Sequence, residues 1–320
     1  MEPKKSVSVV MCTYNGERYI REQLDSIVAQ TYALEEVIIQ DDGSSDHTVD
    51  ICREYARRYP FIQVFVNEQN KGLDANFESA TMRSVGDFVA FSDQDDIWYP
   101  EKIERQVASI GDRDICFSCY DRGPDRAHSV LVRQQYQLEA LLFAGFAGHT
   151  MLLRGDFARN ADHWALGRQT PFMHYDWSLA IHAQLGHGIL RLEEALNLHR
   201  TNPRSAIAQE LKKDGRVPSY APYLYGLHEY RSLQRRPEYR RLYGFIYAHT
   251  SDRFQPLAHE MSGLMLKSGW WALLHLDLLC YRHRSTIYWN EGASGWMGAI
   301  RSFCYPMIFA YNNKKFYRNQ

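Results

Sequence analysis

In the stretch Asp87-Phe88-Val89-Ala90-Phe91-Ser92-Asp93-Gln94-Asp95-Asp96-Ile97-Trp98, a strand-like run leads directly into a cluster of acidic residues. Residues 88–91 are apolar and predict a buried strand. The carboxylates of Asp93, Asp95 and Asp96 follow at its carboxyl end, where like charges repel one another unless a cation lies among them. All-oxygen ligation favours Mg²⁺ or Mn²⁺, which often bind through carboxylates and substrate phosphates. The stretch therefore predicts a divalent-metal site that also holds a diphosphate.

Strand-like and helix-like patterns alternate around this stretch. Apolar, β-branched runs predict strands at residues 7–11, 36–40, 61–67 and 88–91. Helical spacing and helix-start signals predict helices at residues 17–30, 48–59, 73–84 and 100–109. Alternation in units of about 30 residues predicts a Rossmann-like, mostly parallel α/β sheet flanked by helices. Because ligands bind at the carboxyl ends of strands in such sheets, we expect three polar loops to meet at one rim: residues 13–15, 41–42 and 93–96.

The second half of the chain has a different pattern. Strand-like runs occur at residues 115–120 and 150–154, and residues 172–184 mix aromatic and polar side chains around Asp176. Beyond about residue 205 the pattern is helical, with many Tyr and Arg residues. We therefore expect two parts, a domain at residues 1–205 and a helical, aromatic and basic C-terminal extension at residues 206–320.

Composition narrows the class of protein. The 320 residues are 45% hydrophobic, enough for a full core, and the net charge of −1 argues against nucleic-acid binding driven by overall charge. Residues 1–6 lead into a strand without a signal-type apolar run, so we expect a cytoplasmic protein. Six cysteines suit that compartment as free thiols. Cys116 and Cys119 lie in a strand-like run without a second pair, which favours core residues over metal ligands.

The longest apolar segment lies in the C-terminal part. Residues 264–281 contain Lys267, His275 and Asp277, so a membrane-spanning helix is not expected. Two interpretations of its aromatic and aliphatic side chains stay open. They can pack against the body of the protein, or they can rest on a membrane as a peripheral contact, where neighbouring Arg and Lys residues favour anionic lipid. The side chains concerned are Trp270, Trp271, Leu273, Leu274 and Leu278.

Four motifs in order give the sequence a family resemblance. They are Val10-Met11-Cys12-Thr13-Tyr14-Asn15-Gly16, Asp41-Asp42-Gly43-Ser44-Ser45-Asp46, Asn70-Lys71-Gly72 and Ser92-Asp93-Gln94-Asp95-Asp96. Together they resemble family 2 glycosyltransferases of the GT-A fold, over roughly residues 6–205. Residues 92–100 resemble the rhamnosyltransferase-like branch in particular. The resemblance implies an enzyme that uses a nucleoside-diphosphate sugar, either a dTDP-sugar or a UDP-sugar, and Mg²⁺ or Mn²⁺.

The resemblance implies roles for residues at the rim. Asp41 or Asp42 would accept a hydrogen bond from the base, although a turn or helix-cap role is the alternative. Lys71 would reach the diphosphate, unless it is a solvated turn lysine. The same rim would contact the nucleotide through Thr13, Tyr14, Asn15 and Asp93. Asp95 would be the leading direct metal ligand, with Asp93 meeting the ribose, the metal or a metal-bound water.

Inverting transfer needs a base near the acceptor hydroxyl. The resemblance implies Asp176 for this role, within His174-Tyr175-Asp176-Trp177, although a carboxylate at a helix N-terminus is the alternative. Acceptor contacts are expected from Trp98, His149, His174 and Trp177, although a phosphate contact or a satisfied structural histidine is the alternative for His149. In residues 198–202, Asn202 stands where relatives often carry a histidine, and Arg200 or His199 can substitute for a diphosphate or metal contact.

These inferences predict an inverting, metal-dependent glycosyltransferase. It would move a sugar, with rhamnose the first candidate, to a hydroxyl of a surface glycan acceptor that is lipid-linked. A UDP-hexose-dependent enzyme of the same fold is the second candidate. A non-catalytic nucleotide-sugar-binding assembly protein is the third, although the intact carboxylate set argues against it. A nucleotidyltransferase would carry a glycine-rich, basic loop after the first strand, and residues 12–16 do not form one.

Overall fold

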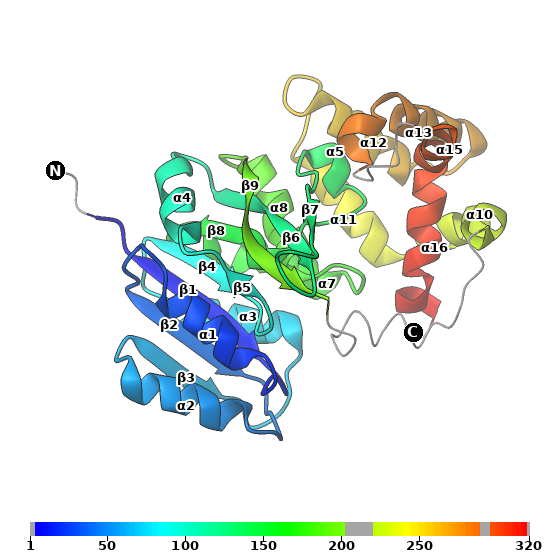
Figure 1. Ribbon diagram of the computed structural model, residues 1–320. Helices are drawn as coiled ribbons and strands as arrows, with labels where there is room; N and C mark the ends of the chain where they lie inside the picture. The colour runs from blue at the N-terminus through cyan, green and yellow to red at the C-terminus, as the bar shows by residue number, and fades with distance from the viewer. Residues whose placement is uncertain (1–3, 202–219, 289–294, 319–320) are drawn as a thin grey trace. The chain divides into compact units, whose positions relative to one another are not determined.

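The computed structural model describes residues 4–201, 220–288 and 295–318 (Figure 1). Contacts within the chain divide it into two compact units. The first comprises Met1–Arg133, Ala147–Trp164 and Gly186–Ser205, and the second comprises Gln134–Phe146, Ala165–Leu185 and Ala206–Gln320. Two segments that precede residue 206 thus group with the C-terminal helices. The division into residues 1–205 and 206–320 stays a prediction.

A nine-stranded sheet organises the described residues of the first unit, in the order β3-β2-β1-β4-β8-β6-β9-β5, with β7 paired to β6. The strands are β1 Val7–Thr13, β2 Glu36–Asp41, β3 Ile62–Val66, β4 Phe88–Ser92, β5 Ile97–Trp98, β6 Ile115–Gly123, β7 Val130–Val132, β8 Met151–Arg154 and β9 Ile189–Arg200. Strands β3, β2, β1 and β4 are parallel, as is the β6–β9 pair, whereas β8 runs antiparallel between β4 and β6. The predicted mostly parallel sheet is confirmed.

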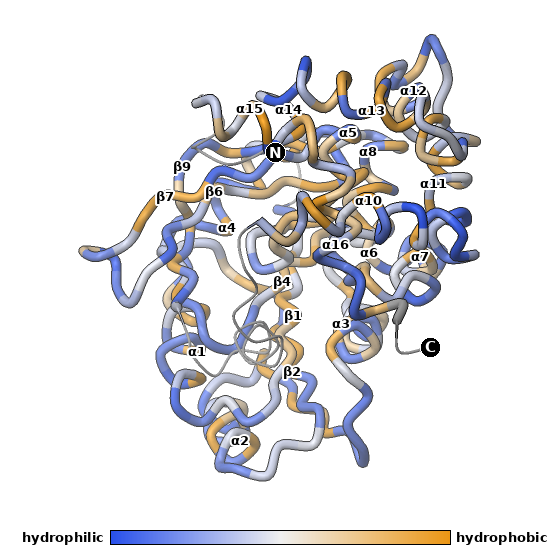
Figure 2. The backbone as a smooth tube through the Cα atoms, turned by 90° about the vertical axis from the view of Figure 1, so that its right-hand side faces the viewer, coloured by the Kyte–Doolittle hydropathy of each residue, from blue (hydrophilic) through white to orange (hydrophobic). Residues whose placement is uncertain are grey.

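Helices cover both faces of this sheet, because alternate residues of its buried strands are apolar on each side. On one face, α1 Ile20–Val28, α2 Thr48–Arg58 and α4 Lys102–Ser109 pack against a core that includes Val9, Met11 and Ile39. On the other face, α3 Leu73–Thr81 places Phe77 with its ring centroid 5.5 Å from that of Phe91. Figure 2 shows hydrophobic residues concentrated along β1, β4 and β6. Cys116 and Cys119 are buried free thiols in β6, so the core interpretation is confirmed.

The second unit is helical, as predicted for the C-terminal part. Its helices are α5 Leu138–Leu141, α7 Ala165–Gln169, α8 Tyr175–Leu185, α10 Ala221–Gln234, α11 Pro237–Ala248, α12 Pro256–Leu266, α13 Trp270–Arg282, α14 Arg284–Ile287, α15 Trp296–Phe303 and α16 Tyr305–Arg318. The apolar residues 264–281 belong to two helices, because the helical conformation is interrupted between α12 and α13 near Gly269, which has φ +134°. Across the described residues, every helix is too short or too polar to span a bilayer.

Candidate functional site

The carboxyl ends of β1, β2 and β4 lie side by side, as the sequence predicts. The parallel register pairs Thr13 with Asp41 and Met11 with Ser92. The loops that follow these strands therefore start from one edge of the sheet.

Asp41 shapes the loop that follows β2. Its carboxylate is fully buried and accepts hydrogen bonds from the Thr13 hydroxyl at 2.8 Å, the Ser44 hydroxyl at 2.6 Å, and the backbone N–H groups of Gly43 and Ser44 at 3.0 and 2.8 Å. The Ser44 hydroxyl in turn accepts the backbone N–H of Asn15, which has φ +49°. Asp41 is thus committed to loop structure, and the base contact expected of Asp41 or Asp42 stays a prediction.

Asp42 joins the second rim loop to the Asn70-Lys71-Gly72 turn. Its carboxylate accepts the backbone N–H groups of Lys71 at 2.8 Å and Gly72 at 2.9 Å, and the side-chain amide of Asn67 at 2.8 Å. Asp42 is 4% exposed. The Lys71 side chain is exposed, and within the described residues its ammonium group makes no hydrogen bond or ion pair. This arrangement leaves Lys71 available to an anionic ligand at the rim.

Gln94 links the acidic loop to the loop after β1. Its Oε1 accepts the backbone N–H of Tyr14 at 3.0 Å, and its Nε2 donates to the carbonyl of Tyr14 at 3.0 Å. Gly16 lies so close that a Cβ atom there would meet Oε1 of Gln94 at 2.1 Å. The Tyr14 ring itself is half exposed, as expected for a group that contacts a ligand.

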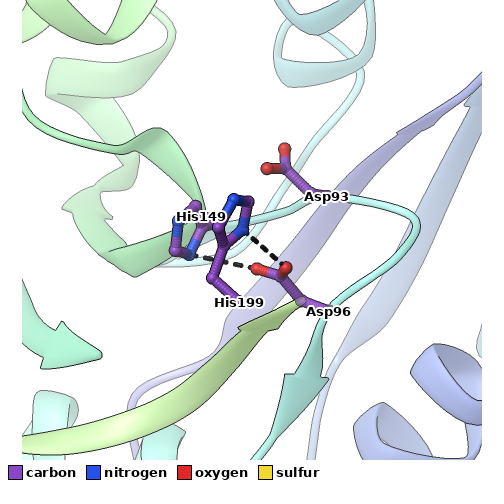
Figure 3. Close-up of side chains that lie close together, drawn as sticks. All are labelled: Asp93, Asp96, His149 and His199. Atoms are coloured by element: carbon purple, nitrogen blue, oxygen red, sulfur yellow. Dashed lines mark hydrogen bonds and ion pairs between the residues drawn. The ribbon is translucent and has the colours of Figure 1, made fainter. Parts of the chain in front are cut away.

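A cluster of acidic and histidine side chains lies at the end of β4 (Figure 3). Asp96 is fully buried, and its two carboxylate oxygens face two imidazoles, with Oδ1 2.8 Å from Nδ1 of His199 and Oδ2 3.1 Å from Nδ1 of His149. The two imidazole rings stack with centroids 4.6 Å apart and an interplanar angle of 8°. Asn197 contacts the same ring nitrogen of His149, with Nδ2 2.9 Å from Nδ1. Asp93 completes the cluster.

The two histidines differ in protonation. Burial, only partly offset by Asp96, lowers the pKa of His149 to about 3, so this ring is neutral. Burial also opposes the charged form of His199, but the carboxylates of Asp96, Asp93 and Asp95 outweigh it and raise the pKa of His199 to about 9. Burial disfavours the ionised form of Asp96 as well, yet the neighbouring histidines keep its pKa below the usual value. The cluster thus contains an ion pair between Asp96 and His199.

The donor set of this cluster fits a divalent metal. One ligand atom from each of Asp93, Asp96, His149 and His199 lies within 4.8 Å of the others. Carboxylate oxygens together with imidazole nitrogens suit Mn²⁺ better than Mg²⁺, which prefers oxygen alone. The all-oxygen set expected from the sequence therefore differs from the set found, because two histidines join it. Asp95 lies outside this group, and its role as a direct ligand stays a prediction.

Three of the side chains expected to contact the acceptor are buried, and their acceptor roles stay predictions. Trp98 is 2% exposed and belongs to the core of the first unit. Trp177 is 6% exposed, and its indole N–H donates to the carbonyl of Leu141 at 2.6 Å in the second unit. His149 is 3% exposed and faces Asp96. These three side chains are therefore internal. His174 is exposed, and its acceptor role stays a prediction.

Asp176 lies in the second unit, in the first turn of α8. Its Oδ1 accepts the backbone N–H of Trp177 at 2.8 Å. A carboxylate at this position interacts favourably with the helix dipole, as the alternative interpretation from the sequence holds. The side chain is partly exposed, so the same carboxylate can also meet a ligand, and its role as a base stays a prediction.

Comparisons with known proteins agree with the motifs. The sequence profile of glycosyl transferase family 2 matches residues 8–175. The dTDP-rhamnosyl transferase RfbG of Shigella flexneri is 41% identical over 103 residues, which are 30% of this chain and 35% of RfbG. The uncharacterized protein Rv1520 of Mycobacterium tuberculosis is 31% identical over 206 residues, which are 61% of this chain and 58% of that protein. The chain thus spans less than two thirds of either relative.

Solved structures share the fold at low sequence identity. TarS of S. aureus in complex with UDP-GlcNAc has a TM-score of 0.56 and 18% identity, over 97% of this chain and 91% of the TarS chain. The mannosyltransferase PcManGT of Pyrobaculum calidifontis, in complex with GDP-Man and Mn²⁺, has a TM-score of 0.50 and 16% identity, over 98% and 88% of the two chains. The predicted GT-A-type fold is thereby confirmed.

Proposed function

The chain belongs to glycosyl transferase family 2, and we propose that it transfers one sugar, with inversion, from a nucleoside-diphosphate sugar to a hydroxyl of a surface glycan. The observation that carries this proposal is the rim at which the loops after β1, β2 and β4 are held together by Asp41, Asp42 and Gln94, beside the cluster around Asp96. The reaction would take place in the cytoplasm, on an acceptor linked to lipid.

Rhamnose from dTDP-rhamnose is the first donor to test, because RfbG, the relative that is 41% identical, is a dTDP-rhamnosyl transferase. A UDP-hexose is the second, because TarS binds UDP-GlcNAc and has the same fold. In either case Asp42 would accept the N3–H of thymine or uracil, and Tyr14 would lie against the nucleotide. Lys71 would approach the diphosphate, since its side chain is exposed and has no carboxylate partner within the described residues.

We assign the divalent metal to Asp93 and His199, with Asp96 behind them. Asp96 faces Nδ1 of His199 and fixes the ring, as a carboxylate does behind many metal-bound histidines. Binding of the metal would displace the proton from Nε2 of His199 and make that nitrogen a ligand. When bound, the metal would offset the charge of the diphosphate and of the departing nucleoside diphosphate. The protein's own part is to bring Asp93, which follows β4, together with His199 of β9.

Asp176 would hold the acceptor hydroxyl and take its proton as the anomeric carbon is attacked. A carboxylate can do so only within hydrogen-bond reach of that hydroxyl. Its partial exposure and its place at the start of α8 support this assignment. Replacing Asp176 by Asn keeps the shape of the side chain and removes the basic oxygen, so donor binding should persist while transfer is lost.

The first experiment measures release of nucleoside diphosphate from a panel of dTDP- and UDP-sugars with Mn²⁺, Mg²⁺ or chelator. Metal-dependent release from one donor, lost in His199→Ala but kept in the exposed control His128→Ala, would support the proposal. His128 pairs with Asp125 on the surface of the same unit and serves as a matched histidine–carboxylate pair.

Calorimetric titration with the same nucleotides and with Mn²⁺ separates the alternatives. Removing the carboxylate partner of a metal ligand commonly lowers metal affinity about 10- to 100-fold, and we expect His199→Ala, which removes the ligand itself, to lower it at least as much. Nucleotide binding without turnover, across a broad panel of acceptors, would instead identify a binding protein. Unchanged Mn²⁺ affinity in His199→Ala would refute the assignment of the metal to the cluster.

A further inference from the structure

A pocket lined by arginines lies in the second unit, away from any role assigned so far. It encloses about 680 Å³ between α10, the start of α11, and the junction of α12 and α13. Arg231 and Arg235 project from α10, Arg240 from α11, and Trp270 opens α13. All four side chains are exposed.

The charge of this pocket is unbalanced. Within the described residues, none of the guanidinium groups of Arg231, Arg235 and Arg240 is in an ion pair, and the pocket lining contains no carboxylate. The Arg231 guanidinium lies 4.2 Å from the centroid of the Trp270 ring, and Arg240 donates to the carbonyl of Leu266 at 3.3 Å. The guanidinium groups of Arg231 and Arg240 are thus held in position, and each keeps N–H groups that can donate to a ligand. The paired N–H groups of a guanidinium can donate two parallel hydrogen bonds to the oxygens of one phosphate.

An exposed apolar stripe begins at the mouth of the pocket. Along α13, Trp271 is 83% exposed, and Leu274, Leu278 and Tyr281 are 41%, 37% and 40% exposed. These positions recur every three or four residues and so share one face of the helix. A second hollow of about 470 Å³ shares Trp270 with the pocket and extends to Trp271. The cationic pocket and the apolar stripe are therefore one continuous surface, which we call the α13 surface.

The opposite face of α13 supplies the packing that a soluble helix needs. Leu273, Leu276 and Cys280 on that face are buried. The exposed stripe is therefore a second apolar face of α13, on which the Tyr281 ring also lies beneath the Arg284 guanidinium, 5.0 Å from the ring centroid. Trp296 and Ile300 are likewise exposed on α15, which packs beside α13 (Figure 1). Such a face is costly in water unless something covers it.

We propose that the α13 surface binds an anionic lipid bilayer, with the phosphate of a lipid headgroup in the arginine pocket and Trp271 in the interfacial layer. Tryptophan and tyrosine favour the membrane–water interface, and nearby arginines favour anionic headgroups. A protein partner is less well matched, because the surface combines a phosphate-sized cationic hollow with a single-helix apolar stripe. The inference deepens the proposed function, since it names the surface that meets a lipid-linked acceptor, but membrane binding does not depend on catalysis.

Flotation of the full-length protein with vesicles tests the proposal. Vesicles of phosphatidylcholine alone are compared with vesicles that also contain about one-third phosphatidylglycerol, so that surface charge is the only variable. We expect binding to the anionic vesicles alone. Arg231→Gln/Arg235→Gln should lower the partition coefficient at least tenfold, because each lost charge near such a surface weakens binding about fivefold. Trp271→Ser should weaken binding at the same lipid composition.

Matched controls guard against general effects of charge and hydrophobicity. Arg57→Gln/Arg58→Gln removes two exposed charges from α2, one of which also lies over an aromatic ring, as Arg231 does. Val85→Ser removes an apolar side chain that is 69% exposed. Both controls should bind vesicles as the unaltered protein does. Equal losses in control and pocket variants would overturn the assignment of binding to the α13 surface.

A second arm separates the lipid headgroup from free phosphate. The protein is titrated with inorganic phosphate in the absence of vesicles, and we expect no saturable heat at millimolar concentration. Saturable phosphate binding without vesicle binding would overturn the bilayer as the ligand. Equal binding to neutral vesicles would also overturn it. Because flotation reports binding and nucleotide release reports turnover, failure of either proposal is recognised without reference to the other.

Discussion

Replacing Gly16 by Ala tests how the rim loops are held together. The added Cβ would lie 2.1 Å from Oε1 of Gln94, closer than any van der Waals contact allows. The Gln94 side chain must therefore move, and it would give up both hydrogen bonds to the backbone of Tyr14. Since Gln94 stands between Asp93 and Asp95, the same movement disturbs the acidic loop.

The magnitude follows from those two hydrogen bonds. Each contributes about 1 kcal/mol net, and because Gln94 is only partly buried, the freed groups can reach water without a large desolvation cost. The change from Gly to Ala also stabilises the fold by roughly 0.4–1 kcal/mol through the unfolded chain. We therefore expect Gly16→Ala to lower the free energy of unfolding by about 1–2 kcal/mol.

A double-mutant cycle measured by urea denaturation checks this reasoning. Gln94→Ala alone should cost about 2 kcal/mol, and in that background Gly16→Ala should stabilise the protein by roughly 0.4–1 kcal/mol, giving a coupling near 2 kcal/mol. Gly72→Ala is the control, because Gly72 has φ +84° and a Cβ there would meet nothing within 4 Å. Its cost should be independent of Gln94. Additive effects of Gly16→Ala and Gln94→Ala would refute the proposed contact.

Two buried charges predict opposite responses of stability to pH. Burial raises the pKa of Asp277 to about 8, so the folded protein binds this proton more tightly than the unfolded chain and loses stability as pH rises from 4 to 8. In that window the free energy of unfolding of Asp277→Asn should rise relative to that of the unaltered protein by up to about 1.4 kcal/mol per pH unit. Burial lowers the pKa of Lys102 to about 7, and its Nζ has no hydrogen-bond partner within the described residues. The folded protein carries the cost of this buried charge at or below pH 7 and sheds it at higher pH, where the buried amine is neutral. Lys102→Met should therefore raise the free energy of unfolding most at or below pH 7, and the gain should disappear toward pH 10. Urea denaturation across pH measures both, and a difference that does not change with pH would contradict the assignment for that residue.

Much of the first unit could be predicted from sequence because its signals are local. Apolar runs such as Val7–Thr13 and Glu36–Asp41 are buried along their whole length, and they end at the polar loops that the motifs mark. The prediction stopped at Met11, whereas β1 continues to Thr13, because Cys12 and Thr13 pair with Gln40 and Asp41 of the neighbouring strand, where the Thr13 hydroxyl also bonds Asp41. That bond depends on strand pairing, which local pattern does not reveal.

The histidine part of the cluster could not be predicted in the same way. It depends on β5, a strand of only two residues, and on its antiparallel pairing with β9, in which Ile97 lies opposite Leu198. Extending that register by one residue places Asp96 opposite His199. A two-residue strand leaves no periodicity to read, and His149 comes from a third segment of the chain. The sequence suggested a metal or diphosphate contact for His199 and an acceptor contact for His149, without placing either beside Asp96.

The structure also changes the argument from which the metal was first inferred. Three neighbouring carboxylates suggest a bound cation. The Asp96 carboxylate, however, already faces a cationic side chain, because its pair with His199 keeps that imidazole protonated near neutral pH. Like-charge repulsion therefore involves chiefly Asp93 and Asp95, which are less buried and better solvated. Crowded charge alone is then weaker evidence for a metal than the sequence suggests. The stronger evidence is the geometry, in which two carboxylates and two imidazoles bring ligand atoms within 4.8 Å of one another.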